Sequence, residues 1–187
     1  MLDPVLRRHT DRLIGPAAAR LAALHIRADS LTLSAFLFTV LAMWDVGHRS
    51  YLLGLGFLVA GRVFDRLDGA VARHVGATRF GAYLDRLLDL TATAGLAFAF
   101  ALAEPDRALA AMFLMLALVV RAAAWMPADR HGGLLAQTGD LVGKSEFFVA
   151  FAVACVFPAW FSILAYVIGV ACFIAAGGRL AAAAEPS

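Results

Sequence analysis

Four aspartates, Asp65, Asp68, Asp85 and Asp89, lie close together in an otherwise apolar part of the chain. On a helix, positions i and i+3, or i and i+4, share one face. If two such helices are adjacent and antiparallel, both pairs converge on one point, where the carboxylates would repel one another without cations between them. Hard divalent ions with oxygen ligands, Mg²⁺ or Mn²⁺, suit such a cluster, and two ions would balance four carboxylates.

Small residues and an arginine accompany the aspartates. Gly69, Ala72 and Gly81 remove side-chain bulk, so a flat ligand or a neighbouring helix can approach the backbone closely. Arg73 is a planar donor suited to phosphate oxygens. Carboxylates that hold divalent metal, together with this arginine and this clearance, indicate phosphoryl chemistry.

The composition indicates an integral membrane protein. Of the 187 residues, 62% are hydrophobic, against about 45–50% in a typical soluble domain. The net charge of +2 gives no reason to expect a nucleic-acid partner. Cys155 and Cys172 lie in apolar runs, which is typical of buried thiols rather than a disulfide framework.

The elements that must position these residues are expected to be helices. We predict one all-α membrane domain over residues 1–187, with an amphipathic interfacial helix in 1–30 and about six transmembrane helices in 31–180. The six helices are expected at about 31–43, 51–76, 80–102, 108–126, 140–157 and 161–176.

Several local details follow from the same pattern. Asp29 or Ser30 is expected to cap the first helix, and the pair Gly177-Gly178 is expected to end the last one. Gly54, Gly56 and Gly61 are expected to form helix–helix contacts.

The distribution of basic residues predicts the orientation. Arginines precede the first helix, stand between the second and third, and occur near the junction of the fourth and fifth, whereas the opposite side has only Arg49 and Arg107. Both termini and the aspartate cluster are therefore expected on the cytoplasmic side of an inner or plasma membrane.

The free-energy cost of burying charged aspartates in a membrane must be offset. Three kinds of protein could offset it. A charged Asp at the centre of a spanning helix costs about 2.5–3.5 kcal/mol on insertion scales. Metal ions would offset this cost in an enzyme, and Arg62, Arg66 and Arg86 would offset it in a non-catalytic membrane scaffold. An ion or proton pathway lined by Asp is the third possibility. The scaffold and the pathway leave the small residues and Arg73 unexplained.

The full set of spacings resembles the signature of the CDP-alcohol phosphotransferase family. That signature reads D-x-x-D-G-x-x-A-R, a short spacer and G-x-x-x-D-x-x-x-D, and it is matched at all eight fixed positions: Asp65, Asp68, Gly69, Ala72, Arg73, Gly81, Asp85 and Asp89. The resemblance implies a membrane enzyme of phospholipid synthesis, similar to compact bacterial members, that forms homodimers. A Pro-Asn-x-x-Thr segment often precedes the first helix in this family, and Ala28 and Asp29 stand here in place of Pro and Asn.

The resemblance also implies roles for the matched residues. A donor such as CDP-diacylglycerol would pass its substituted phosphate to an alcohol and release CMP. Asp65, Asp68 and Asp85 would bind metal, while Asp89 would lie near the metals and act as general base. Gly69, Ala72 and Gly81 would make room for the cytidine nucleotide, and Arg73 would contact its phosphates.

The acceptor alcohol is less strongly indicated. Chain length favours glycerol 3-phosphate, as in phosphatidylglycerophosphate synthases, with inositol phosphate, inositol or serine as alternatives. Arg121, Arg130 and Lys144 are candidates to bind a phosphate on the acceptor. Each also lies near an expected cytoplasmic helix end, where positive charge is equally explained by topology.

Overall fold

The computed structural model describes residues 20, 28–76, 78–125 and 143–184, and six α-helices make up most of these ranges. They are α2 (Ala28–Gly47), α3 (Tyr51–Val75), α4 (Arg79–Ala103), α5 (Ala108–Trp125), α6 (Lys144–Val156) and α7 (Phe161–Ala184). Short 3₁₀ turns, η1 (Pro105–Arg107) and η4 (Pro158–Trp160), precede α5 and α7. The described residues contain no strand, so the predicted all-α fold is confirmed.

Proline, glycine and a capping threonine set the helix boundaries. Pro105 and Pro158 each stand at the first position of a 3₁₀ turn, where the missing N–H is tolerated. Gly76 has a φ of 100°, a left-handed value that glycine adopts without steric strain, and it ends α3. Thr78 caps α4, because its Oγ1 accepts a hydrogen bond of 2.9 Å from the Gly81 N–H. A tight turn therefore joins α3 and α4.

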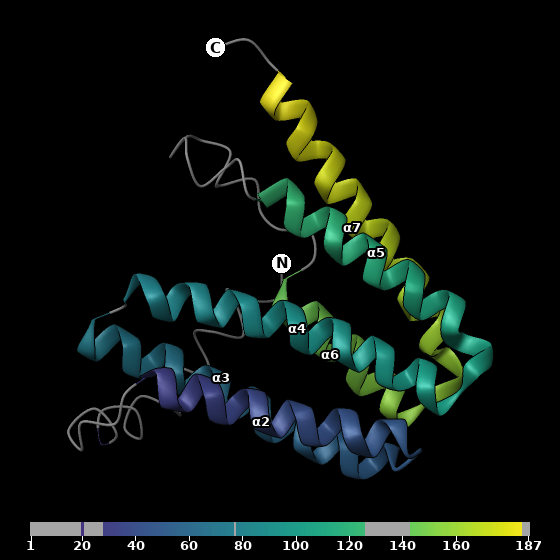
Figure 1. The fold of residues 1–187 in the computed structure, drawn as a ribbon, viewed down its shortest axis with the longest axis horizontal. Helices are drawn as coiled ribbons and strands as arrows, with labels where there is room; N and C mark the ends of the chain where they lie inside the picture. The colour runs from purple at the N-terminus through teal and green to yellow at the C-terminus, as the bar shows by residue number, and fades with distance from the viewer. Residues whose placement is uncertain (1–19, 21–27, 77, 126–142, 185–187) are drawn as a thin grey trace.

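The helices form two groups, as Figure 1 shows. Helix α2 packs against both α3 and α4, α6 packs against α3, and the pair α5 and α7 extends away from α4. Glycines allow α2 and α3 to approach closely. A Cβ at Gly54 would lie 2.8 Å from a Val46 side-chain atom, and one at Gly61 would lie 3.0 Å from the Ala35 carbonyl oxygen. A Cβ at Gly56 would meet nothing within 4 Å among the described residues, so the close contact predicted for Gly56 is not formed there.

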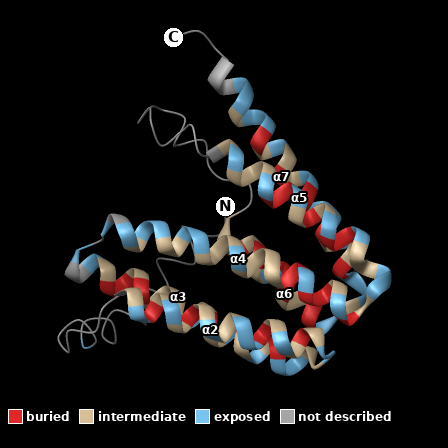
Figure 2. Ribbon diagram, viewed as in Figure 1, coloured by how far each residue is buried: buried red, intermediate tan, exposed pale blue. Residues whose placement is uncertain are grey.

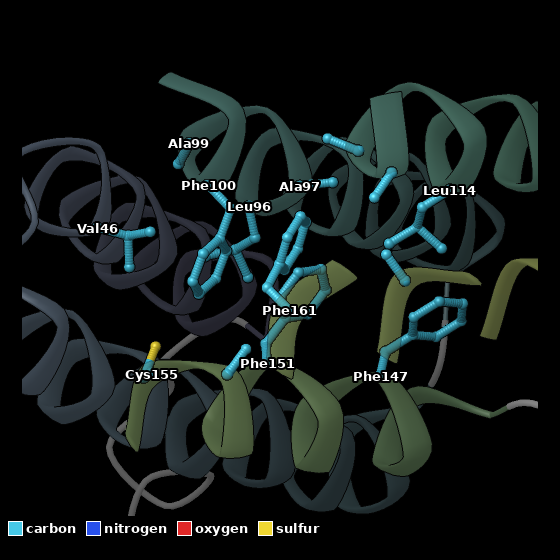
Figure 3. Close-up of a cluster of buried hydrophobic side chains, with 14 of the residues drawn as sticks. Val46, Leu96, Ala97, Ala99, Phe100, Leu114, Phe147, Phe151, Cys155 and Phe161 are labelled. Carbon is cyan, nitrogen blue, oxygen red and sulfur yellow. The ribbon is translucent and has the colours of Figure 1, made fainter. Parts of the chain in front are cut away.

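The largest apolar core lies near the turns that join α4 to α5 and α6 to α7 (Figures 2 and 3). Phe100 of α4 and Phe161 of α7 are fully buried and stack with ring centroids 4.4 Å apart. Phe151 of α6 stacks on Phe100 at 6.2 Å. Cys155 and Cys172 are buried in the core, as predicted. This core joins both groups of helices at the end of α4 that is remote from Asp85.

Length and composition qualify four segments to cross a membrane: Asp29–Gly47, Phe80–Ala103, Pro105–Ala124 and Pro158–Ala181. Large apolar side chains such as Leu52, Leu109 and Ile163 are exposed on the helix surfaces, where they suit lipid. Helix α3 contains several charged residues, and α6 has 13 residues. These two helices contribute many of the polar groups described below, and the expectation of six spans remains a prediction.

The structure corrects both predictions about helix ends. Asp29 and Ser30 already lie within α2, so neither is its cap. Contacts of the first turn of α2 with α3 and α4, described below, stabilise this extra length. Helix α7 continues through Gly177-Gly178 to Ala184. Each interior glycine costs about 1 kcal/mol relative to alanine, but the alanines around the pair are the strongest helix formers. The predicted interfacial helix lies outside the described residues, apart from Arg20 and residues 28–30.

Candidate functional site

Three of the four aspartates meet between α3 and α4, which both pack against α2. Asp65 and Asp68 of α3 and Asp85 of α4 each offer a carboxylate oxygen, and the three oxygens lie within 4.8 Å of one another. Asp68 is 7% exposed, and its buried Oδ2 has no hydrogen-bond partner among the residues that the structure describes. A buried carboxylate oxygen without a donor, beside two further carboxylates, fits a hard divalent cation.

Helix α2 supports the cluster from a third side. Thr32, in the second turn of α2, forms a side-chain hydrogen bond with the Asp68 carboxylate. A Cβ at Gly81 would lie 2.9 Å from Asp29 Oδ1 and 3.0 Å from Thr78 Oγ1. A larger residue at position 81 would have to displace the Asp29 carboxylate, because the first turn of α2 packs against the first turn of α4.

Asp89 lies one turn beyond Asp85 on α4, outside the group of three. Its Oδ1 is 3.6 Å from the Lys144 Nζ, and it lines the same cavity as Asp65 and Asp85. The sequence therefore placed all four aspartates in one region, but the tight cluster contains three of them.

Lys144, the first residue of α6, lies among the carboxylates. Its Nζ is 2.9 Å from Asp85 Oδ1, 3.0 Å from Asp85 Oδ2 and 3.4 Å from Asp65 Oδ1. The start of α6 is fixed by the Gly143 N–H, which donates to Glu146 Oε2 at 3.0 Å. Lys144 was predicted to bind the acceptor; the structure shows it paired with residues predicted to bind metal.

Ser145 connects α6 to α3 and was not singled out from the sequence. It is 2% exposed, and its Oγ accepts hydrogen bonds from Arg62 Nη2 at 3.0 Å and Arg66 Nη2 at 3.1 Å. Arg62 Nη1 donates to Asp65 Oδ2 at 2.8 Å. One carboxylate of the cluster is therefore oriented by an arginine that is itself held by α6. The only local indication is the spacing of Arg62 three residues before Asp65.

An open cavity of about 90 Å³ lies beside the carboxylates. Its polar end contains Thr32, Asp65, Asp85, Asp89 and Lys144. The remainder is mainly apolar and runs about two helical turns toward the core, with lining side chains that include Phe36, Leu58, Leu88, Ala92, Leu96, Phe147, Phe148 and Phe151. The cavity is thus charged at one end and apolar along its length.

The other predicted residues take three kinds of position. Gly69 and Ala72 are half-buried on α3, and Arg73 is exposed. A Cβ built on Gly69 would lie 3.8 Å from Arg73 Nη1. Arg121 of α5 lies over the ring of Phe147, 5.5 Å from its centroid, and so stands behind a wall of the cavity. Arg130 lies outside the described residues.

Comparisons with known proteins identify the family to which the chain belongs. The family model of the CDP-alcohol phosphatidyltransferases matches residues 25–177. The inner membrane protein YnjF of Escherichia coli is 30% identical over 93% of this chain and 91% of its own length. An archaetidylinositol phosphate synthase of Pyrococcus horikoshii is 37% identical over 44% of each chain.

The fold is similar to that of the phosphatidylinositol phosphate synthase PgsA1 of Mycobacterium tuberculosis, solved with CDP-DAG bound. The TM-score is 0.75 at 21% identity, over 90% of this chain and 92% of the other. A second structure of the same enzyme, in complex with manganese and citrate, also has a TM-score of 0.75. The match over most of the chain, the apolar helices and the carboxylate cluster lead to one conclusion: this chain is an integral membrane enzyme of the CDP-alcohol phosphatidyltransferase family.

Proposed function

We propose that this enzyme transfers a phosphatidyl-type group from a CDP-linked lipid, such as CDP-diacylglycerol, to an alcohol and releases CMP. The observation that carries the proposal is the cavity, which joins a carboxylate cluster to an apolar channel. The charged end suits a metal-bound pyrophosphate, and the apolar length suits an acyl chain. A lipid substrate and a water-soluble one can therefore meet at one site.

Asp65, Asp68 and Asp85 would hold Mg²⁺ or Mn²⁺, with Asp89 next to them. When bound there, the ions supply Lewis-acid stabilisation of the negative charge on the pyrophosphate. Thr32 and Arg62 orient two of the carboxylates from α2 and α3, so the cluster is fixed before any ligand arrives. All-oxygen donor sets favour these hard ions over softer metals.

Asp89 is our candidate general base. It lines the cavity next to the cluster, where the acceptor hydroxyl must approach the donor. The carboxylate would take the hydroxyl proton while the alcohol oxygen attacks the phosphorus bonded to the lipid. The bond from that phosphorus to the bridging oxygen of CMP then breaks, and CMP leaves with the electron pair.

The nucleotide would occupy the opposite side of the cluster, near the turn between α3 and α4. Gly69, Ala72 and Gly81 keep this region free of bulk, and the exposed guanidinium of Arg73 lies close to Gly69. An arginine in this position can pair with the phosphates of CDP.

For the acceptor we propose an inositol phosphate in place of the glycerol 3-phosphate expected from chain length. Two relatives that share fold or sequence with this chain are named as inositol phosphate lipid synthases. Lys144, which lines the cavity, is the cation proposed to bind the acceptor phosphate, whereas Arg121 lies behind Phe147 and Arg130 lies outside the described residues. Inositol and serine carry no phosphate for Lys144 to bind.

The proposed reaction also leads to proposals for the orientation of the enzyme in the membrane and for its oligomeric state. The arginines near the α3–α4 turn support our proposal that the catalytic cluster and both termini face the cytoplasm. The exposed apolar side chains of the helices would face the bilayer. We also propose a homodimer, as the family resemblance implies.

CMP release by purified protein tests the reaction and the acceptor together. The protein would be incubated with CDP-diacylglycerol, Mg²⁺ or Mn²⁺, and one acceptor at a time: inositol phosphate, glycerol 3-phosphate, inositol or serine. We expect metal-dependent CMP with inositol phosphate and none from Asp89→Asn, whereas Asp106→Asn, in η1 beyond the far end of α4, should match the wild type. Full CMP release by Asp89→Asn would refute the base assignment, and glycerol 3-phosphate as the sole active acceptor would refute the acceptor proposal.

A further inference from the structure

The ammonium of Lys144 contacts the carboxylate oxygens that are proposed to bind metal. It lies 2.9 and 3.0 Å from the two oxygens of Asp85 and 3.4 Å from one oxygen of Asp65. The other oxygen, Asp65 Oδ2, accepts a hydrogen bond of 2.8 Å from Arg62 Nη1. Within the group of three, two of the carboxylates therefore already hold cationic side chains.

We propose that Lys144 is a tethered cation that competes with a divalent ion for Asp85 and Asp65, so complete metal loading requires its side chain to withdraw. This inference rests on the proposed function in one respect, that the metal binds these aspartates. Both oxygens of Asp85 accept hydrogen bonds from Lys144, and an ammonium and a divalent ion at this range repel each other. One carboxylate cannot serve both fully.

The structure allows the side chain to move while its helix stays in place. Lysine has a flexible four-carbon stem, and the Lys144 side chain is 33% exposed. The next residue, Ser145, is buried and bonded to Arg62 and Arg66 of α3, which holds the start of α6. Rotation about the side-chain bonds of Lys144 is therefore sufficient.

Withdrawal needs another anionic partner, and the acceptor phosphate provides one. An ammonium that exchanges Asp85 for a phosphate leaves the carboxylate to the metal. Metal loading and acceptor binding would then favour each other, which is a coupling between two ligands of one site. The donor could not be activated fully before the acceptor is present.

Mn²⁺ binding to the full chain in detergent, without nucleotide or acceptor, tests the competition. Free Mn²⁺ would be followed by electron paramagnetic resonance for the wild type, Lys144→Met and Lys144→Arg. Because a charge-assisted hydrogen bond must be broken for the ion to bind, we expect Lys144→Met to bind Mn²⁺ about tenfold more tightly or to bind an additional equivalent. Lys144→Arg should stay near the wild type.

Two further variants test whether Mn²⁺ binds at Asp85 and whether the gain in affinity is specific to the charge of Lys144. Asp85→Asn should lose affinity, and unchanged binding would mean that the ion lies elsewhere and would overturn the proposal. Arg49→Met removes a positive charge at the α2–α3 turn, beside Ala103, about 27 Å along α4 from Asp85. An equal gain in Arg49→Met would reveal a general charge effect and also overturn it.

Equal or weaker Mn²⁺ binding by Lys144→Met would refute the competition directly. If that variant is not recovered as monodisperse protein, Lys144→Gln removes the same charge and is judged in the same way. Because no substrate is present, the result is separate from the transfer reaction. A chain that transfers no lipid group can still show the competition, and an active enzyme can fail to show it.

Discussion

Ser145 offers a sharp test of how the site is held together, because a single hydroxyl joins α6 to two arginines of α3. Its Oγ accepts from Arg62 at 3.0 Å and from Arg66 at 3.1 Å, and the residue is 2% exposed. Ser145→Ala removes this acceptor and leaves the hydrophobic neighbours unchanged. Each hydrogen bond to a charged group contributes about 1.5–3 kcal/mol.

The two bonds share one acceptor, so we expect a loss of about 3 kcal/mol rather than the full sum. For a chain of this size, 1 kcal/mol corresponds to roughly 2–4 °C in Tm, so the Tm of Ser145→Ala should fall by about 6–12 °C. Arg62 also orients Asp65 at 2.8 Å, so Mn²⁺ affinity should fall in the same variant. Thermal unfolding in detergent and the Mn²⁺ titration measure the two effects.

Ser34→Ala is the matched control for this prediction. Ser34 Oγ donates to the Ser30 carbonyl within the same helix, so the same chemical change removes only a local bond. Its Tm should stay within about 2 °C of the wild type. If Ser145→Ala and Ser34→Ala unfold at the same temperature, the link between α6 and α3 does not stabilise the protein, and the reasoning fails.

Three further predictions concern packing, two at the site and one in the apolar core. Gly81→Ala should reduce nucleotide-dependent activity and lower the Tm by a few degrees, because its Cβ would lie 2.9 Å from Asp29 Oδ1; activity and unfolding of the purified variant check this. Ala92→Trp should fill the apolar part of the cavity, so CMP release from the lipid donor should fall while Mn²⁺ binding is retained. Parallel assays of CMP release and Mn²⁺ binding would show whether the cavity holds the lipid. Phe100→Ala should destabilise the chain by about 3–5 kcal/mol, because Phe100 is fully buried in the aromatic stack, whereas Phe80→Ala, at a side chain 66% exposed, should have little effect on the Tm.

Local spacing explains why much of this site was predictable. Asp65 and Asp68 share a face because they are three residues apart on one helix, and Gly76 forces a tight turn that returns the chain to Asp85. Both relations depend on residues close in sequence. The helix ranges followed in the same way from long apolar runs separated by Gly and Pro.

Contacts between distant parts of the chain were not predictable from these patterns. Lys144 pairs with Asp65 across 79 positions, and Ser145 bonds to Arg62 across 83. A lysine at the start of a helix is equally explained by membrane topology, so its type and position gave no sign that it lies among carboxylates. Asp29 likewise satisfied the rule for a helix cap, although it lies within α2 and against Gly81.

Glycines show how the same residue type leads to different outcomes within one chain. Gly76 adopts a φ of 100° and ends α3, whereas Gly177 and Gly178 lie inside α7 with no neighbour within 4 Å. At Gly76 the chain must reverse so that α4, like α3, packs against α2, and a left-handed residue makes this possible. No helix has to pack against the end of α7 in the described residues, so its alanines continue the helix and tolerate the two glycines. The backbone conformation that the tertiary structure requires at a glycine, more than its presence, therefore decides whether it ends a helix.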